Sequence, residues 1–186
     1  MKKKRPGKSG RTELESCVLG VVWLHQPCSA YVVRRDFANS MSSYWTGSAG
    51  AIYPAVARLE RLGLIESVEH PWGRRTRKEY TLTRSGKRSL RSWIEPPLDG
   101  WTSAPAFDPV RTRATFITLL SPEARRKFVE SAIANLTVRI AEMKTAAPEM
   151  KLGEVGDYFG FVGAIYELEG RLRWLRWLRK QLPDIL

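Results

Sequence analysis

The sequence predicts a mainly α-helical chain in two parts, with one β-hairpin in the first part and helices alone in the second. Apolar residues recur at helical spacing along most of the chain, which is the primary signal of amphipathic helices. Two short runs with strand-like alternation flank the segment HPWGRRTR at 70–77, where proline and glycine favour a turn. A proline-rich linker over 96–108 separates the two parts.

Composition and charge narrow the class of protein. Hydrophobic residues form 43% of the 186 residues, but the longest apolar run, at 17–24, is shorter than the about 20 residues of a membrane-spanning helix. No apolar stretch of signal-peptide type follows the N-terminal lysines, so we expect a cytoplasmic protein without a membrane partner. The net charge of +12 is clustered, which indicates a polyanionic partner: DNA, RNA or an acidic membrane surface.

Enzymatic and metal-dependent functions are not expected. The two cysteines, Cys17 and Cys28, lie outside any CxxC pair, and with only two histidines a zinc site or a disulfide framework is not predicted. The sequence has neither a GxSxG nucleophile elbow nor a phosphate-binding loop. We therefore expect no catalytic residues, no metal and no cofactor.

The first part, residues 12–95, is expected to begin with two short helices. Thr12 can cap the first helix, and Glu15, three residues later, completes a capping box. The second helix is expected to bury Val33 and Phe37, which lie four residues apart on one face.

A third helix is expected to begin with Ser48 as its cap and to end at Gly63, since glycine is favoured just beyond a helix C-terminus. Pro54 removes a backbone donor near its start, so we expect a kinked or tightened first turn. The residues expected to point inward are Ile52, Val56, Leu59 and Leu62.

Two strands, over 64–69 and 78–82, and a fourth helix from Thr83 through Ile94 complete the first part. This element order, with three helices followed by a two-stranded wing and a further helix, is that of a winged helix-turn-helix domain. Residues 1–11 precede it as a basic tail that is expected to be disordered.

In such a domain the helix before the wing enters the major groove of DNA, and basic residues of the wing contact phosphates. The alternatives are that Tyr53 is a half-buried core residue and that the wing charges only keep a hairpin soluble. The candidate DNA-binding residues are Ser48, Ala49, Gly50, Tyr53, Arg74, Arg75, Arg77 and Lys78.

The second part, residues 109–186, is predicted to be entirely helical. Asp108 with Pro109 and Ser121 with Pro122 fit the first positions of two helices. Apolar residues then recur in alternating steps of four and three, which is coiled-coil spacing on two helices, with a break expected at Pro148 and Gly153. These helices could pack on each other, on a partner chain, or both.

The run GSAGAIYPAVARLERLGLIES, followed by GRRTRKEYTLTRSGKRSL, closely resembles the PadR family of transcriptional regulators. The similarity in detail covers about residues 12–95, with a looser likeness downstream to the longer branch of the family. The matching positions are Ile52, Tyr53, Pro54, Val56, Leu59, Gly63, Leu64, Ile65, Gly73, Arg74, Arg75, Tyr80, Leu82, Thr83 and Gly86.

This resemblance implies a regulator that binds a palindromic operator in double-stranded DNA as a homodimer. Of the two kinds of regulator, a repressor is expected. It implies that Tyr53 contacts DNA, that the wing arginines lie on the DNA backbone, and that the C-terminal helices and the first helix form the dimer contact. The residues expected there are Leu14, Val18, Phe161, Ile165, Leu168, Leu172 and Leu175.

Tryptophans near the expected dimer region, namely Trp93, Trp101 and Trp174, offer stacking surfaces for a small aromatic effector, although core or interface packing is the favoured explanation for them. Two other classes of function stay open. An RNA-associated protein would share the positive charge, and the C-terminal run GRLRWLRWLRKQL has the basic amphipathic character of a membrane-surface helix.

Overall fold

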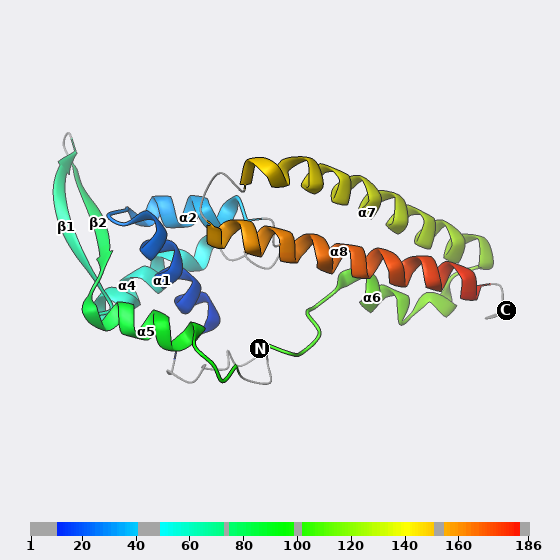
Figure 1. The fold of residues 1–186 in the computed structure, drawn as a ribbon, viewed down its shortest axis with the longest axis horizontal. Coiled ribbons are helices and arrows are strands. Elements are labelled where there is room, and N and C mark those ends of the chain that lie inside the picture. The colour runs from blue at the N-terminus through cyan, green and yellow to red at the C-terminus, as the bar shows by residue number, and fades with distance from the viewer. Residues whose placement is uncertain (1–10, 41–48, 73–74, 99–101, 151–154, 183–186) are drawn as a thin grey trace. The chain divides into compact units, whose positions relative to one another are not determined.

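A computed structural model of the chain describes residues 11–40, 49–72, 75–98, 102–150 and 155–182. The chain divides into two compact units, residues 1–104 (unit 1) and residues 105–186 (unit 2), and the boundary falls within the predicted linker. Most of the described chain is helical, with one antiparallel hairpin in unit 1 (Figure 1), as the sequence predicts. None of the helices within the described segments is long and apolar enough to cross a membrane.

Helices α1 (Glu13–His25) and α2 (Ala30–Ala38) open unit 1. The capping box predicted for α1 is present: the Thr12 hydroxyl accepts from the Glu15 amide, and the Glu15 carboxylate accepts from the Thr12 amide. The predicted inward face of α2 is also confirmed, since Val33 and Phe37 are both buried. Short-range capping and periodicity therefore suffice to place these two helices.

The next helix begins with a 3-10 turn, η1 (Ala49–Ala51), and continues as α4 (Ile52–Arg61). The tightened start expected from Pro54 is therefore present. Ser48 lies outside the described residues, and Ala51 occupies the cap position of α4 without a side-chain hydrogen bond.

The C-terminal end of α4 corrects one prediction. Gly63 has a φ of 67°, and the amides of Gly63 and Leu64 bond back to Glu60 and Leu59, which closes the helix as a Schellman motif. Leu62 was expected to point inward but is 51% exposed, because the helix ends at this residue and the chain turns away from the core.

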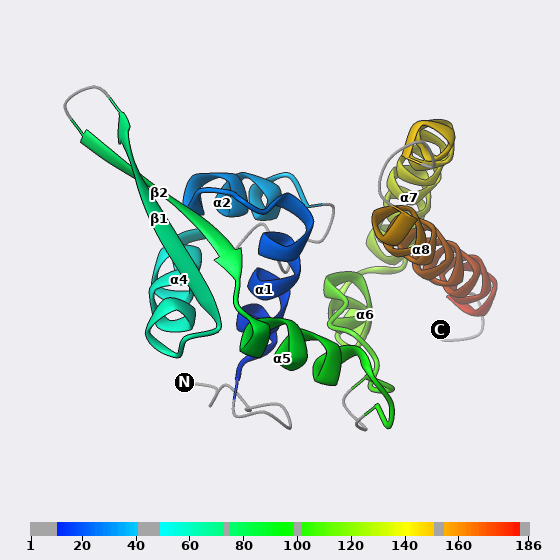
Figure 2. The same ribbon diagram turned by 60° about the vertical axis from the view of Figure 1, so that its left-hand side comes forward.

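The wing is longer than predicted. Strands β1 (Ile65–Trp72) and β2 (Arg75–Leu82) pair in register from Ile65 opposite Leu82 to Trp72 opposite Arg75. Pro71, expected to belong to the turn, therefore lies within a strand; this two-stranded ribbon has only edge strands, where proline is tolerated. Figure 2 shows the hairpin extending beyond the helices of unit 1.

The base of the wing is fastened to the rest of unit 1 by backbone contacts. Cys28, between α1 and α2, exchanges both backbone hydrogen bonds with Tyr80, at 3.1 and 2.7 Å. Helix α5 (Arg84–Ile94) follows β2 with the predicted Thr83 cap. Gly86 on α5 packs so closely that an added Cβ would lie 1.9 Å from the backbone oxygen of Leu64.

The core of unit 1 joins α1, α2, α4, the wing base and α5. The residue before α1, Arg11, was expected to belong to a disordered tail, but it is 5% exposed and donates a hydrogen bond to the backbone oxygen of Ser89 at 3.0 Å. The largest fully buried side chains of this core are Val18, Leu19, Val22, Val33, Ile52, Val56, Leu59 and Ile65.

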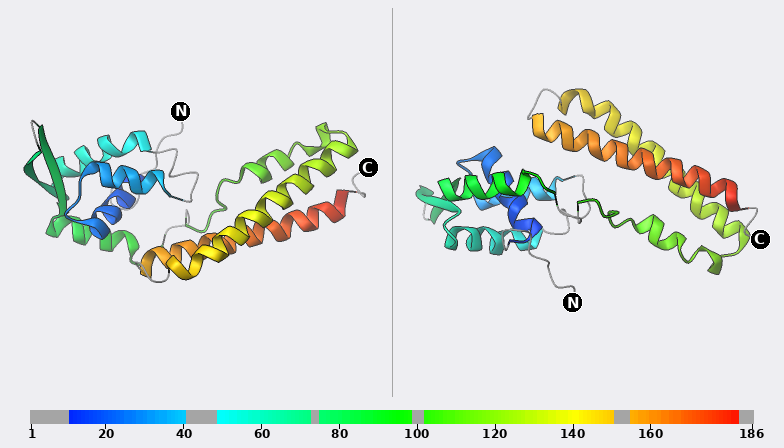
Figure 3. Two further views of the ribbon diagram at one scale, coloured as in Figure 1. Left: turned by 90° about the horizontal axis from the view of Figure 1, so that it is seen from above. Right: turned by 60° about the horizontal axis from the view of Figure 1, so that its bottom comes forward.

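Unit 2 consists of α6 (Pro109–Ala114), η2 (Ile117–Leu119), α7 (Pro122–Met150) and α8 (Val155–Gln181). Helices α7 and α8 lie side by side (Figure 3) and bury the predicted apolar repeats against each other. The break expected at Pro148 and Gly153 falls between the two helices, since α7 ends at Met150 and α8 begins at Val155; Gly153 itself lies outside the described residues. Pro148 lies in the last turn of α7, where only one backbone donor is lost and the helix continues to Met150.

The face of α8 opposite its core face carries aromatic residues. Phe159, Tyr166 and Trp177 are separated by 7 and 11 residues, close to two and three turns at 3.6 residues per turn, so they share one side of the helix. Their side chains are 66%, 69% and 57% exposed. The other described residues of unit 2 therefore leave an aromatic stripe exposed on α8.

Candidate nucleic-acid interface

Helix α4 presents one face to the core of unit 1 and the other to solvent. Ile52 and Leu59 are fully buried, whereas Tyr53 is 49% exposed. Gly50, just before α4, is exposed, and a Cβ added there would meet nothing within 4 Å. Tyr53 and Gly50 are therefore accessible as predicted; Ser48 and the side chain of Ala49 lie outside the described residues.

A buried carboxylate fixes α4 against α1. Glu15 is 5% exposed, and its carboxylate lies 3.3 Å from Nε of Arg58 on α4. Arg58 thus connects two helices of the domain. The capping box contact of Glu15 holds the same carboxylate in place.

The described cations of the wing are paired with carboxylates. Arg77 Nη2 lies 3.2 Å from Glu79, and Lys78 Nζ lies 3.3 Å from Glu60 on α4 and 3.9 Å from Glu69 on β1. Arg74 and the side chain of Arg75 lie outside the described residues. No pattern in the sequence marks Glu60 as a partner of the wing, whereas the pairing of Glu69 opposite Lys78 follows from the register of the hairpin.

Hydrogen bonds keep the Glu60–Lys78 pair charged. The Ser67 hydroxyl donates to Glu60 at 2.6 Å, which together with Lys78 lowers the pKa of Glu60 below its ordinary value. The hydrogen bond that Lys78 donates to Glu60 in turn raises the pKa of Lys78. Both groups are therefore ionised across the neutral range.

The two thiols of unit 1 are not poised for redox chemistry. Burial, with a smaller contribution from Glu13, raises the pKa of Cys17 to about 12. Burial, with smaller contributions from Glu79 and Asp36, raises the pKa of Cys28 to about 11. A reactive cysteine needs a lowered pKa, so both thiols serve packing.

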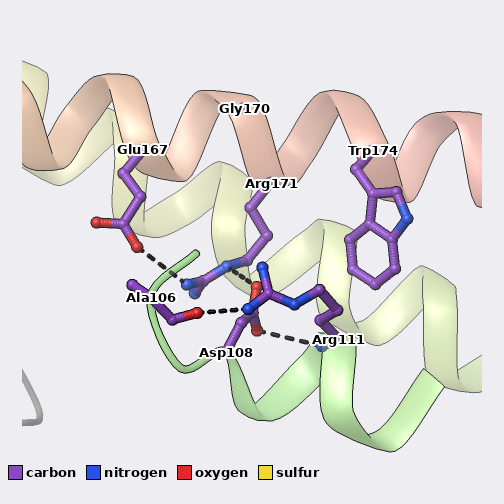
Figure 4. A pocket seen from close by; sticks show the side chains of 7 residues that line it. All are labelled: Ala106, Asp108, Arg111, Glu167, Gly170, Arg171 and Trp174. Carbon is purple, nitrogen blue, oxygen red and sulfur yellow. Dashed lines mark hydrogen bonds and ion pairs between the residues drawn. The ribbon is translucent and has the colours of Figure 1, made fainter. Parts of the chain in front are cut away.

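A separate hollow of about 280 Å³ lies within unit 2, between α6, the residues before it, and α8 (Figure 4). Asp108 caps α6 and pairs with Nε of Arg171 at 2.6 Å, which fastens α6 to α8. Asp108 is therefore part of the folded unit rather than of a linker. Arg111, whose guanidinium bonds to the backbone oxygen of Ala106, and Trp174 line the same hollow.

The expected effector tryptophans lie in different parts of the chain. Trp93 belongs to unit 1, where it packs against the core and donates from Nε1 to Glu13 at 3.2 Å. Trp174 belongs to unit 2 and lines the hollow described above. Trp101 lies outside the described residues.

The residues expected at a dimer contact pack inside a single chain. Leu14 and Val18 lie in the core of unit 1, and Ile165, Leu172 and Leu175 lie in the core of unit 2. Val18 and Leu175 are 0% exposed, so their side chains offer no surface to a partner. Phe161 and Leu168 are half-buried.

Comparison with known proteins agrees with this geometry. Residues 18–92 match the Transcriptional regulator PadR-like family. The negative transcriptional regulator PadR of Bacillus subtilis (strain 168) is 22% identical over 166 residues, which cover 84% of this chain and 89% of that protein.

Solved structures share the fold at low sequence identity. The crystal structure of B. subtilis PadR in complex with operator DNA has a TM-score of 0.74 at 20% identity, covering 91% of this chain and 98% of that one. The same protein in complex with p-coumaric acid has a TM-score of 0.68 at 18% identity, covering 93% and 98%. The sequence match therefore marks residues 18–92 as a PadR-like domain, and the solved structures show that the chain shares its fold with B. subtilis PadR.

Proposed function

We propose that this protein regulates transcription by binding double-stranded DNA through α4 and the β1–β2 wing of unit 1. The observation that carries the proposal is the exposed Tyr53 on α4, next to a long hairpin, within the segment that matches the PadR-like family. A winged helix-turn-helix domain uses this helix in the major groove. The net charge of +12 supplies the attraction to phosphate.

The bound state is proposed to be a homodimer on a palindromic operator. Phe159, Tyr166 and Trp177 form an aromatic stripe on α8, and a second copy of the same stripe is its natural cover. Two DNA-binding units would then place their α4 helices about 34 Å apart, one turn of DNA. The similarity to a negative regulator favours repression as the outcome.

Selection of bound fragments from a random-sequence DNA pool tests this function. We expect enrichment of palindromic sites and binding that weakens steeply with salt, since each neutralised phosphate adds about 0.9 to the salt slope. The triple variant Tyr53→Phe/Arg74→Ala/Arg75→Ala is expected to bind all duplexes more weakly and with a smaller slope. Unchanged affinity in this variant, or no enrichment at all, contradicts the proposal.

A small aromatic acid is proposed as the effector, and the hollow of unit 2 supports it. Arg111 can bind a carboxylate and Trp174 can stack on a ring, in a space that suits a ligand of this size. The B. subtilis PadR structure that contains p-coumaric acid makes this compound the first probe.

Titration with p-coumaric acid, followed by tryptophan fluorescence and by DNA affinity, tests the effector. We expect a fluorescence change and weaker binding to the selected duplex, both lost in Arg111→Ala. Arg113→Ala on the same helix, which does not line the hollow, is the matched control. Responses that persist in Arg111→Ala would place the effector elsewhere.

A further inference from the structure

Glu60 lies at the junction between the proposed recognition helix and the wing. Its Oε1 accepts a hydrogen bond from the Ser67 hydroxyl on β1 at 2.6 Å and another from Nζ of Lys78 on β2 at 3.3 Å. One carboxylate oxygen on α4 thus holds both strands. The Glu60 side chain is 30% exposed and that of Lys78 is 43% exposed, so the contacts lie at the surface where DNA would approach.

The carboxylate of Glu60 is unexpected beside a proposed DNA-binding surface. DNA phosphates repel negative charge, so an acidic side chain beside the proposed interface weakens binding unless it serves another purpose. Its contacts supply that purpose, because they connect α4 to both strands of a hairpin whose far end extends away from the helices. The angle between helix and wing decides whether both can engage one duplex.

The same contact changes the role of Lys78. A lysine contributes to the salt slope of DNA binding when it neutralises a phosphate. The ammonium of Lys78 is already compensated by Glu60, with Glu69 at 3.9 Å as a second carboxylate. To bind phosphate, Lys78 would have to leave a pair that is charged on both sides across the neutral range.

We propose that Glu60 is a positioning residue for DNA binding, which holds the wing against α4 through Ser67 and Lys78 and keeps Lys78 from acting as a phosphate ligand. This inference rests on the proposed function. It reverses the expectation from sequence, in which Lys78 contacts DNA.

The test is the salt dependence of binding to a fluorescent duplex from the selected pool, measured for four proteins. Wild type is compared with Lys78→Met, Glu60→Gln and Glu60→Gln/Lys78→Met. Glutamine keeps an oxygen that can accept from Ser67 and removes only the charge. Lys127→Met is the matched control, because Lys127 in unit 2 is likewise paired, with Glu123 at 2.6 Å, and its loss changes the net charge equally.

We expect Lys78→Met to leave the slope of wild type unchanged, whereas loss of a phosphate ligand would lower it by about 0.9. Glu60→Gln removes the nearer of the two carboxylates beside the ammonium, which leaves the contact with Glu69 at 3.9 Å, and is expected to raise the slope by up to about 0.9; the double variant is expected to return it to the wild-type value. The return identifies Lys78 as the source of the added slope.

Two results would overturn the inference while leaving the proposed function intact: a lower slope in Lys78→Met, or a wild-type slope in Glu60→Gln. If wild type binds no duplex from the pool, the proposed function fails and this inference fails with it. Glu60→Ala removes both contacts and is expected to reduce the preference for the selected duplex over a scrambled one; an unchanged preference would contradict the positioning role.

Discussion

Unit 1 and unit 2 are stabilised in different ways. In unit 1 every helix and the base of the wing share one core, and polar contacts such as Glu15–Arg58 and Glu60–Lys78 cross between elements. In unit 2 one long seam between α7 and α8 carries the core, and the Asp108–Arg171 pair fastens the short helix α6 beside it. The outer face of α8 remains aromatic and exposed.

This difference separates two tasks. A closed core with fixed surface charges suits recognition of a rigid, charged partner, because the contacting groups keep their geometry without that partner. A unit whose core is one seam between two long helices, with an exposed aromatic stripe on the outer face of α8, has apolar area still to bury, and exposed patches of this kind mark interaction sites. Unit 1 is accordingly the proposed reader of DNA and unit 2 the proposed site of self-association.

The largest effect is expected from Gly86→Ala, which tests whether unit 1 is closed around its core. The added Cβ would lie 1.9 Å from the Leu64 oxygen and 3.3 Å from Leu82 Cγ, and neither the backbone nor the core can yield freely. We expect unit 1 to lose more than about 3 kcal/mol of stability while unit 2 keeps its own. Urea unfolding with residue-resolved hydrogen exchange separates the two units.

Gly20→Ala is the control, because an added Cβ there meets only Leu90 Cδ1 at 4.0 Å. Gly20 lies within α1, where alanine is favoured over glycine by roughly 0.5–1 kcal/mol. Equal behaviour of the two variants would show that α5 does not pack on the strand base as described.

The next effect concerns unit 2. Phe159→Asp/Tyr166→Asp places two charges on the exposed stripe of α8 and leaves the α7–α8 seam untouched. We expect the dimer dissociation constant, measured by analytical ultracentrifugation, to rise about a hundredfold, or about 2.8 kcal/mol. Arg126→Asp, at an exposed position of α7, is expected to leave it unchanged. An intact dimer in the double variant would move the contact to another surface.

The sequence predicts the two units unequally well, for a physical reason. Helix starts at Thr12, Thr83 and Asp108 follow from capping, which depends on residues within three positions of each other. The outward turn of Leu62 depends on where the chain goes after Gly63, and the Cys28–Tyr80 bridge joins distant segments. Such contacts leave no periodic signal.

The candidate site shows the same limit. Charge alone predicts a basic wing, but it cannot tell a cation that is free to bind phosphate from one that a carboxylate already holds. Glu60 is separated from Lys78 by 18 residues, and only the fold brings them together. The Glu69–Lys78 pair, by contrast, follows from the register of the two strands, so it can be predicted once the hairpin is recognised in the sequence.

A smaller effect is expected for Tyr53→Phe, which tests whether unit 1 reads bases. Removal of the hydroxyl should weaken binding to the selected duplex by about 1–3 kcal/mol if it contacts a base edge, and leave binding to a scrambled duplex unchanged. Tyr31→Phe on α2, also exposed, is the matched control. An equal loss for both duplexes would assign Tyr53 to the phosphate backbone instead.

The smallest effect concerns the thiols, which occur only in unit 1 and so report on that unit alone. The pKa of a thiol in the unfolded chain is about 8.5. Burial raises the pKa of Cys28 to about 11 and that of Cys17 to about 12 in the folded protein. Because the unfolded state loses its protons first, the stability from these groups is complete below about pH 8.5 and declines as pH rises toward the folded pKa, about 11 for Cys28 and about 12 for Cys17.

Reaction with a disulfide reagent at pH 8 is therefore expected to be more than about tenfold slower in the native protein than in urea. Melting temperatures between pH 7 and pH 10 should fall, and Cys28→Ala should make the decline shallower. Native thiols that react as fast as denatured ones would mean that α1 and the wing base unfold locally with ease. Unit 1 would then not have the closed core that distinguishes it from unit 2.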